Sequence, residues 1–262
     1  MSEVVVIGAG GFIGRAVCAR LEAVGHRAHR VLRGQPLPAA PGAACLHLAG
    51  SNDPSVYESD AALKEARELA AKVLAAGYGR VVYASTAQVY GGGYTRPVAE
   101  DAAPAPESAY ARLKLSLEPL FSTAPHAVAR LSNIYGPGQA AVNVLSHVLR
   151  QFPGDGVMRL QGSPDAVRVY LFVDDAAQAL IALALSPDSG NFNISTGRGT
   201  SVAALIELLA KVHGVAPPRI ESAGGKASQL VLDPGKAAAR LGWRAKVSLE
   251  NGLATLLSGI HR

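Results

Sequence analysis

A short β-branched run followed by spaced glycines opens the chain and limits the folds that it can adopt. Residues 4–7 read VVVI, which is typical of a buried parallel strand, and GAGGFIG follows almost at once. The next stretch, FIGRAVCARLEAVGH, has the pattern of an amphipathic helix that ends at Gly25. A strand, a glycine turn and a helix in this order predict a βα unit at the start of a parallel sheet.

Strands and helices continue to alternate after this unit. Strands are expected at 27–33, 45–50, 80–86 and 126–134, helices at 59–76 and 108–121, and a Pro/Gly-rich link without a helix at 34–44. This alternation predicts an α/β fold with a doubly wound parallel Rossmann sheet.

The pattern becomes less regular after residue 137. A helix is expected at 140–151, a strand at 168–173, a helix at 174–185, a strand at 190–195, and a further helix capped by Thr200 or Ser201. We therefore expect a Rossmann domain at 1–136, with returning segments at about 168–195. Residues 137–262 are expected to form mainly a smaller C-terminal substrate lobe.

Composition argues against several classes of protein. The net charge is +5, but the basic residues are scattered and aromatic residues make up only 5%, so nucleic acid is not an expected partner. No apolar run reaches the roughly 20 residues that a membrane span needs. The chain also lacks a basic leader at its start, so a cytoplasmic location is expected. Cys18 and Cys45 are expected to be reduced core residues, and no spacing of ligands predicts a metal site.

The glycine turn is a candidate dinucleotide site. Gly8, Gly11 and Gly14 would permit a tight turn, a close approach of a pyrophosphate, and close packing of the helix on the sheet. Phe12 and Ile13 begin the helix, where free N–H groups and a partial positive charge favour an anion. A glycine turn without a ligand is the alternative.

Two arginines stand where a dinucleotide-binding chain usually has an acid that holds the ribose 2′-hydroxyl. Leu32 falls near that position by count, with Arg33 next to it and Arg30 two residues before it. An arginine there can bind a 2′-phosphate through a charge-assisted contact, so NADP(H) is preferred and NAD(H) remains possible. The alternative is that both arginines are solvated at a sheet edge.

A tyrosine and a lysine are spaced as a catalytic pair. Tyr110 and Lys114 lie one helical turn apart in YARLK, and Thr86 ends a predicted strand. A free phenol has a pKa of about 10, and a nearby ammonium group would favour its phenolate form. Thr86 would hold the carbonyl oxygen of a substrate in line.

Several motifs occur in one order along nearly the whole chain. They are GAGGFIG, HLAG, YASTAQVYG, YARLK, ARLSNIYGPGQ, RVYLFVDDAAQA and LGWRAKVSLENGL. The set resembles the extended short-chain dehydrogenase/reductase family, also called NAD-dependent epimerase/dehydratase, and is similar to its NADPH-using nucleotide-sugar ketoreductases. The resemblance implies a Rossmann domain with a small substrate lobe, and a nucleotide-activated sugar as substrate.

The resemblance also assigns residues. It places Leu48 and Ala49 beside the cofactor, makes Thr86, Tyr110 and Lys114 catalytic, and gives Lys114 a bond to the nicotinamide ribose. Gln88, Asn133 and Arg168 fall at positions expected to contact the substrate. Asn133 could instead be an amide that stabilises a turn, and Arg168 could form a surface ion pair.

Three departures from the family pattern limit the reactions that can be expected of this chain. The link at 34–44 is too short for the usual helix and edge strand, which predicts an exposed adenine pocket. Ala87 and Gln88 follow Thr86 where 4,6-dehydratases carry Asp-Glu, so dehydration is not expected. The Cys/His acid–base pair of epimerase-reductases is not recognisable, and we expect no such role for the histidines at 126, 147 and 213.

These features favour an NADPH-dependent ketoreductase acting on a nucleotide-linked 4-keto-6-deoxyhexose. Three alternatives stay open: a nucleotide-sugar 4-epimerase with tightly bound NAD, a ketoreductase acting on a non-sugar natural-product intermediate, and a non-catalytic nucleotide sensor. The resemblance implies a homodimer formed through the helices at 59–76 and 108–121.

Overall fold

A parallel sheet of six strands forms the centre of the computed structural model, which describes all residues except 52, 140–143, 153, 261 and 262. The strands lie in the order β2-β1-β3-β4-β5-β9 and every neighbouring pair is parallel. Their bounds are β1 (Glu3–Ile7), β2 (Arg27–Val31), β3 (Ala44–His47), β4 (Arg80–Thr86), β5 (Ala127–Leu131) and β9 (Gly190–Ile194). The expected doubly wound Rossmann sheet is confirmed.

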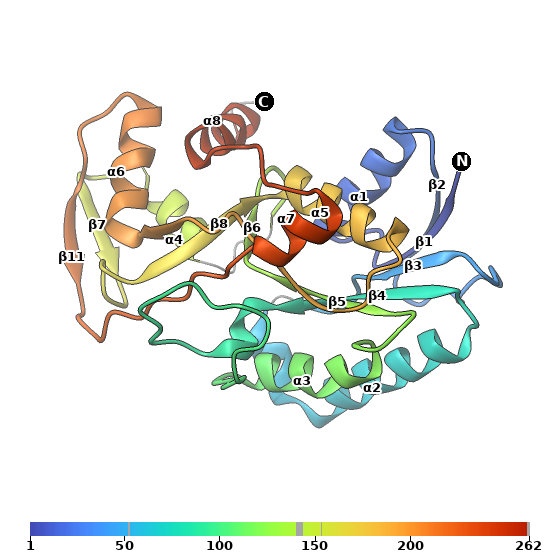
Figure 1. Cartoon of the computed structure of the whole chain (residues 1–262). Coiled ribbons are helices and arrows are strands. Elements are labelled where there is room, and N and C mark those ends of the chain that lie inside the picture. Colours follow the sequence, from blue (N-terminus) through green and yellow to red (C-terminus); the bar gives the residue numbers. More distant parts are fainter. Residues whose placement is uncertain (52, 140–143, 153, 261–262) are drawn as a thin grey trace.

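Helices cover both faces of this sheet (Figure 1). One face carries α1 (Phe12–Ala23), α5 (Val173–Leu185) and α7 (Gly235–Leu241), and the other carries α2 (Asp60–Ala75) and α3 (Ala109–Leu117). Each face has its own apolar core, and the middle strands are buried on both sides. Burial on both sides explains why these strands are continuous apolar runs rather than alternating ones.

The edge of the sheet ends at β2 because the link after it is short. Residues 32–43 form neither helix nor strand, as the Pro/Gly-rich composition predicts. The link folds back under the sheet instead, where Leu37 and Ala40 pack on the core and the hydroxyl of Tyr78 donates to the carbonyl of Pro38. The side of β2 away from β1 therefore pairs with no strand among the described residues.

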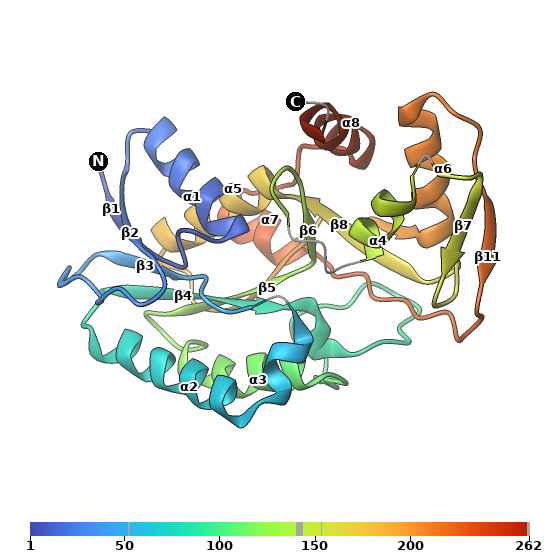
Figure 2. The same cartoon turned by 180° about the vertical axis from the view of Figure 1, so that it is seen from behind.

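A second group of elements lies at the carboxyl end of the central strands (Figure 2). It contains a sheet in the order β10-β8-β6, a pair β11-β7, and three helices around a separate apolar core. Their bounds are β6 (Asn133–Tyr135), β7 (Val157–Leu160), β8 (Val167–Phe172), β10 (Gly199–Ser201), β11 (Arg219–Ser222), α4 (Val144–Gln151), α6 (Val202–His213) and α8 (Leu249–Ile260).

The strand expected at 126–134 is wrong in one respect, because it is two strands in two sheets. The chain leaves the central sheet at Ser132, whose backbone N–H still bonds to the carbonyl of Ile194, the last residue of β9. From Asn133 onward it pairs with β8 instead. This crossing carries Asn133 from the Rossmann sheet into the second group.

The other expected elements are largely confirmed. Ser201, rather than Thr200, caps α6 by accepting a bond from the N–H of Ala204. The helix expected at 140–151 is present from Val144, while its first four residues lie outside the described part of the chain. Within the described residues, no helix combines the length and apolar character needed to cross a membrane.

Candidate active site

The glycine turn between β1 and α1 has the geometry of an anion cradle. Gly8 has a φ of +87°, which favours glycine, and a Cβ on it would lie 2.9 Å from the backbone nitrogen of Ala49. A Cβ on Gly14 would lie 2.2 Å from the carbonyl oxygen of Gly8, so only glycine lets the helix pack this close. Gly11 caps α1 without a side chain and leaves the first helical N–H groups accessible.

The end of β3 completes this turn. Leu48 donates its backbone N–H to the carbonyl of Ile7 over 2.9 Å, and Ala49 follows directly beside Gly8. Phe12 and Ile13 form the first turn of α1, so the predicted cofactor residues at positions 8–14, 48 and 49 are brought together. The glycines, the open helix N-terminus and the absence of an acid in its first turn fit the pyrophosphate of a dinucleotide.

The two arginines of the second strand differ in their surroundings. Arg30 points back along α1 and donates to Glu22 in an ion pair of 2.7 Å. Arg33 lies beyond the end of β2, is 89% exposed, and faces Glu65 at 3.6 Å. Leu32 approaches the glycine turn, since a Cβ on Gly10 would lie 3.2 Å from it. Only Arg33 therefore lies at the carboxyl end of the sheet with a loosely held guanidinium.

Helix α3 presents Tyr110 and Lys114 toward the end of β4. Ser108 begins the helix by accepting a bond from the N–H of Ala111 over 3.1 Å. Lys114 is 7% exposed and donates from Nζ to the carbonyl oxygen of Ala84 over 2.8 Å. Its Nζ lies 5.9 Å from the ring centroid of Tyr110, so the predicted pair does share one face of the helix.

The groups that the chain itself places around Tyr110 raise the pKa of its phenol, and the expected lowering relies on the nicotinamide ring as well as on Lys114. Burial raises the pKa of this phenol, the neighbouring Tyr57 raises it further, and only the hydrogen bond from Thr86 opposes the rise. Tyr57 covers Tyr110, with ring centroids 5.5 Å apart. Burial also lowers the pKa of Lys114 to about 8. Lys114 donates to the carbonyl of Ala84, and the effect of burial dominates the pKa of the phenol.

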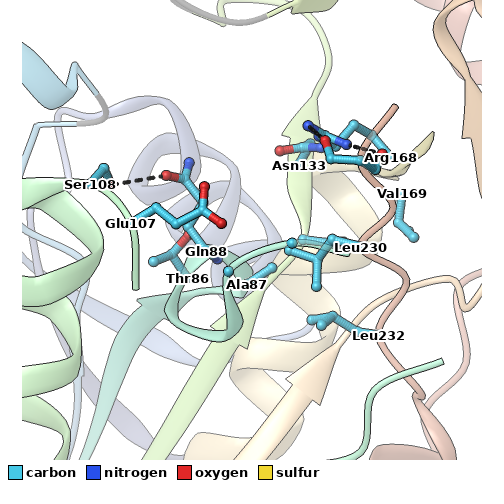
Figure 3. A pocket seen from close by; sticks show the side chains of 14 residues that line it. Thr86, Ala87, Gln88, Glu107, Ser108, Asn133, Arg168, Val169, Leu230 and Leu232 are labelled. Carbon is cyan, nitrogen blue, oxygen red and sulfur yellow. Dashed lines mark hydrogen bonds between the residues drawn. The ribbon is translucent and has the colours of Figure 1, made fainter. Parts of the chain in front are cut away.

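Thr86 ends β4 and faces a cavity of about 290 Å³ (Figure 3). The Thr86 hydroxyl accepts from the N–H of Gln88, whose side chain also lines the cavity. Asn133 and Arg168 line the opposite wall, at the start of β6 and on β8. The four residues expected to contact substrate therefore share one cavity, although they come from both groups of elements.

Arg168 does not form the surface ion pair that was the alternative for it. Its guanidinium donates to the carbonyl and hydroxyl oxygens of Ser228, each over 2.8 Å, and to the carbonyl of Val167. All of these acceptors are neutral, so the bonds themselves do not cancel the positive charge of Arg168.

The sequence analysis missed Glu107, Ser108 and Ser228 in this cavity. Ser108 carried a signal, because a serine two residues before a helical tyrosine is a natural cap. Glu107 directly precedes Ser108, so it could have been predicted to lie at the same end of the helix. Ser228 had no signal, since it lies on an irregular segment 60 residues from Arg168 and is placed only by the tertiary fold.

A second cavity of about 530 Å³ adjoins the first and shares Arg168 and Ser228 with it. His147, Arg150 and Lys226 also line it, so its polar wall is basic. The other two histidines named above lie elsewhere: His126 accepts from the N–H of Val81, and His213 packs on Phe152. No group of three metal-ligating side chains occurs among the described residues.

Comparison with known proteins agrees with this arrangement. The dTDP-L-rhamnose 4-epimerase of Burkholderia thailandensis is 30% identical over 60% of this chain and 47% of that protein. The dTDP-4-dehydro-6-deoxyglucose reductase of Escherichia coli is 28% identical over 70% of this chain and 61% of that protein. The chain thus spans about half to three fifths of the length of these two relatives.

Two further matches extend over almost the whole chain. The dTDP-6-deoxy-L-talose 4-dehydrogenase (NAD(P)(+)) of Kitasatospora kifunensis is 26% identical over 97% of this chain and 94% of that protein. The structure of MoeE5 in complex with UDP-glucose and NAD is 27% identical, with a TM-score of 0.84 over 100% of this chain and 99% of that one. Residues 40–195 match the NAD dependent epimerase/dehydratase family, and the chain belongs to this family.

Proposed function

We propose that this chain is an NADPH-dependent ketoreductase that reduces the keto group of a nucleotide-activated 4-keto-6-deoxyhexose. The observation that carries the proposal is the meeting of three features at the carboxyl end of the sheet. The glycine turn follows β1 and fits a dinucleotide, Thr86 with its neighbour Tyr110 lies at the end of β4 in the same sheet, and Thr86 opens into the cavity lined by Arg168. The similarity to a dTDP-sugar reductase and a dTDP-sugar 4-dehydrogenase supports the same chemistry.

The proton chemistry follows from the state of Tyr110. Because burial raises the pKa of its phenol, Tyr110 carries its proton at neutral pH and can donate it. A nicotinamide coenzyme held by the glycine turn would supply the hydride that reduces the keto carbon. Tyr110 gives its proton to the developing alkoxide, and the hydroxyl of Thr86 donates a hydrogen bond to the same oxygen. Lys114 holds positive charge next to Tyr110 and would bond the nicotinamide ribose.

The two adjoining cavities suit the two halves of a sugar nucleotide. The hexose would occupy the cavity beside Thr86, where Gln88 and Asn133 offer amide groups. The diphosphate would lie where the cavities meet, at the guanidinium of Arg168, with Lys226 and Arg150 in the second cavity. The nucleoside would then fill the remainder of the larger cavity.

The open edge of the sheet favours a cofactor that binds and dissociates readily rather than one that stays bound. Because residues 32–43 form no helix or strand, Leu32 and Arg33 are the side chains that would lie near the adenosine end on this side. A coenzyme held this loosely suits a reductase, which must release its oxidised coenzyme in every turnover. An epimerase must retain it. The exposed Arg33 supports NADP(H) over NAD(H).

The deciding experiment follows NADPH absorbance with the purified chain. Addition of a dTDP-linked 4-keto-6-deoxyglucose should oxidise NADPH in proportion to the keto-sugar added, and the Tyr110→Phe variant should not. The second candidate, a 4-epimerase, is favoured by the similarity to dTDP-L-rhamnose 4-epimerase. It predicts coenzyme retained through purification and interconversion of 4-epimers without net NADPH consumption. That result would overturn the reductase proposal.

Two expectations about the protein in the cell remain predictions. A homodimer formed through α2 and α3 would sediment at twice the mass of the chain, and charged substitutions on these helices would dissociate it. A cytoplasmic location fits the use of NADPH and an activated sugar.

A further inference from the structure

A buried ion pair lies directly behind the candidate catalytic residues. The side chains of Arg130 and Glu118 are only 3% and 4% exposed, and Nη2 of Arg130 donates to Oε2 of Glu118 over 2.6 Å. Nε of Arg130 reaches both carboxylate oxygens, at 3.1 and 3.2 Å. Glu118 follows the last residue of α3, while Arg130 lies in β5, so the pair joins the helix to the central sheet.

The same carboxylate contacts the strand that ends at Thr86. Oε1 of Glu118 accepts from the hydroxyl of Ser85 over 2.6 Å. One helical turn earlier, Lys114 donates to the carbonyl of Ala84 over 2.8 Å. Two successive turns of the α3 segment are therefore bonded to two successive residues of β4. This double attachment fixes how far the helix slides along the strand, and so where Tyr110 meets Thr86.

The network continues from Arg130 toward the substrate cavity. Nη1 of Arg130 donates to the hydroxyl of Tyr90 over 2.7 Å, and its guanidinium lies 4.7 Å above the ring of Tyr90. Tyr90 in turn donates to Asn193, whose N–H bonds to the carboxylate of Glu100 over 2.8 Å. Tyr90 closes the short helix η2 (Ala87–Tyr90), which carries Gln88 into the cavity.

We propose that Glu118 is a positioning residue that sets the register of α3 on β4 and keeps Lys114 charged for catalysis. An apolar pair would fill this space with no desolvation cost, so an ion pair that is buried here points to a role for its charge and its directed bonds. The charge of Glu118 also raises the pKa of Lys114, against the stronger lowering caused by burial. This inference depends on the proposed function only in its kinetic test, because the NMR titration of Lys114 needs no turnover.

Other groups around Lys114 do not supply a negative charge at neutral pH. They are Tyr110 on its own helix, Tyr83 on β4, His47 on β3 and Tyr57 on η1 (Pro54–Glu58). Burial raises the pKa of all three tyrosines, and it lowers the pKa of His47 to about 3. Glu118 is the carboxylate that acts on Lys114 among the described residues.

The direct test titrates Lys114 without any turnover. Protein labelled with ¹³Cε-lysine is followed by NMR between pH 6 and 10, and the signal is assigned with a Lys114→Arg variant. We expect a midpoint near 8 for the parent. For Glu118→Gln we expect a midpoint lower by at least about half a unit, because an opposite charge has been removed. Glu118→Asp, which keeps the charge, should restore the parent value.

Glu100→Gln is the matched control, since it removes a carboxylate of the same network that does not face Lys114. If Glu118→Gln does not fold because Arg130 is left unpaired, Glu118→Gln/Arg130→Met removes both charges and serves in its place. An unchanged midpoint in the folded Glu118 variant would overturn the proposal. A midpoint that falls equally in Glu100→Gln would overturn it too.

A kinetic measurement separates this inference from the proposed function. The alkaline limb of kcat/KM for keto-sugar reduction should move down in Glu118→Gln by the same amount as the NMR midpoint. If the NMR midpoint moves but no variant oxidises NADPH, the ketoreductase assignment fails and the role of Glu118 in charging Lys114 stands. If both the parent and Glu118→Gln oxidise NADPH and their kcat/KM values depend on pH in the same way, the proposed role of Glu118 is wrong.

Discussion

The guanidinium of Arg15 bridges the glycine turn and the loop that follows β6. Its Nη1 donates to the carbonyl of Gly10 over 2.7 Å, and its Nη2 donates to the carbonyl of Gly138 over 3.2 Å. Gly138 comes five residues after Asn133, which lines the candidate substrate cavity. The first turn of α1 is thus tied to the strand that carries a candidate substrate residue, across 123 residues of sequence.

This bridge predicts that Arg15→Ala weakens the coupling between cofactor and substrate. We expect NADPH to increase the affinity of the parent for a sugar nucleotide about fivefold, within the usual range of coupling energies, and to have little effect in the variant. Calorimetric titration with and without NADPH measures both values. Arg20→Ala, at the exposed far end of the same helix, is the control. Equal coupling in parent and Arg15→Ala would contradict the prediction.

Loss of the Tyr110 hydroxyl should remove turnover without unfolding the chain. Proton transfer by a positioned side chain contributes typically 10²–10⁴-fold, so Tyr110→Phe should lower kcat by about that factor. The ring can still stack on Tyr57, so the melting temperature should change little. Tyr78→Phe removes a phenol whose hydroxyl donates to the carbonyl of Pro38, before the start of β4 and outside both cavities, and should keep its kcat. A similar loss in both variants would count against a catalytic role.

Much of the fold could be predicted from local sequence patterns. Buried parallel strands are continuous apolar runs, and the glycine turn has a unique geometry, so the βα units could be predicted one by one. The break at Ser132 could not, because residues 126–134 contain no glycine or proline that would mark a turn. Only the pairing of Asn133–Tyr135 with β8 decides where one strand ends and the next begins.

The site was predictable where its residues form short motifs. Tyr110 and Lys114 are one helical turn apart, whereas Ser228 reaches Arg168 only through the tertiary fold. The surroundings of Tyr110 could not be predicted for a similar reason. Spacing places an ammonium near the phenol, but it cannot show that Tyr57 covers the ring and that a backbone carbonyl engages the lysine.

Cofactor preference should depend on Arg33 and not on Arg30. Arg33 is exposed at the carboxyl end of β2, so Arg33→Ala should weaken NADPH binding about tenfold and leave NADH binding unchanged. Arg30→Ala is the matched control, because its guanidinium is held by Glu22 at 2.7 Å. Fluorescence titration of the parent and both variants with both coenzymes gives the six dissociation constants. A loss of NADPH affinity in Arg30→Ala alone would reverse the assignment.

Acid should destabilise the fold partly through His47. Burial, with a smaller contribution from the charge of Lys114, lowers the pKa of this imidazole to about 3. An unfolded histidine titrates near 6.5, so between these values the unfolded chain binds one more proton than the folded chain. Stability contributed by neutral His47 is therefore full above pH 6.5 and is lost as pH falls toward 3. The slope is at most about 1.4 kcal/mol per pH unit for this one proton.

The variant His47→Phe tests this dependence. Phenylalanine binds no proton and can keep the aromatic contacts with Tyr83 and Phe121, so its unfolding free energy should fall less steeply between pH 6.5 and 4. Urea unfolding at several pH values measures the slopes. His213→Gln, at a half-buried histidine that packs on Phe152, controls for loss of a histidine as such. Parallel slopes for the parent and His47→Phe would show that His47 takes up its proton without unfolding, and the buried environment assigned to it would then be wrong.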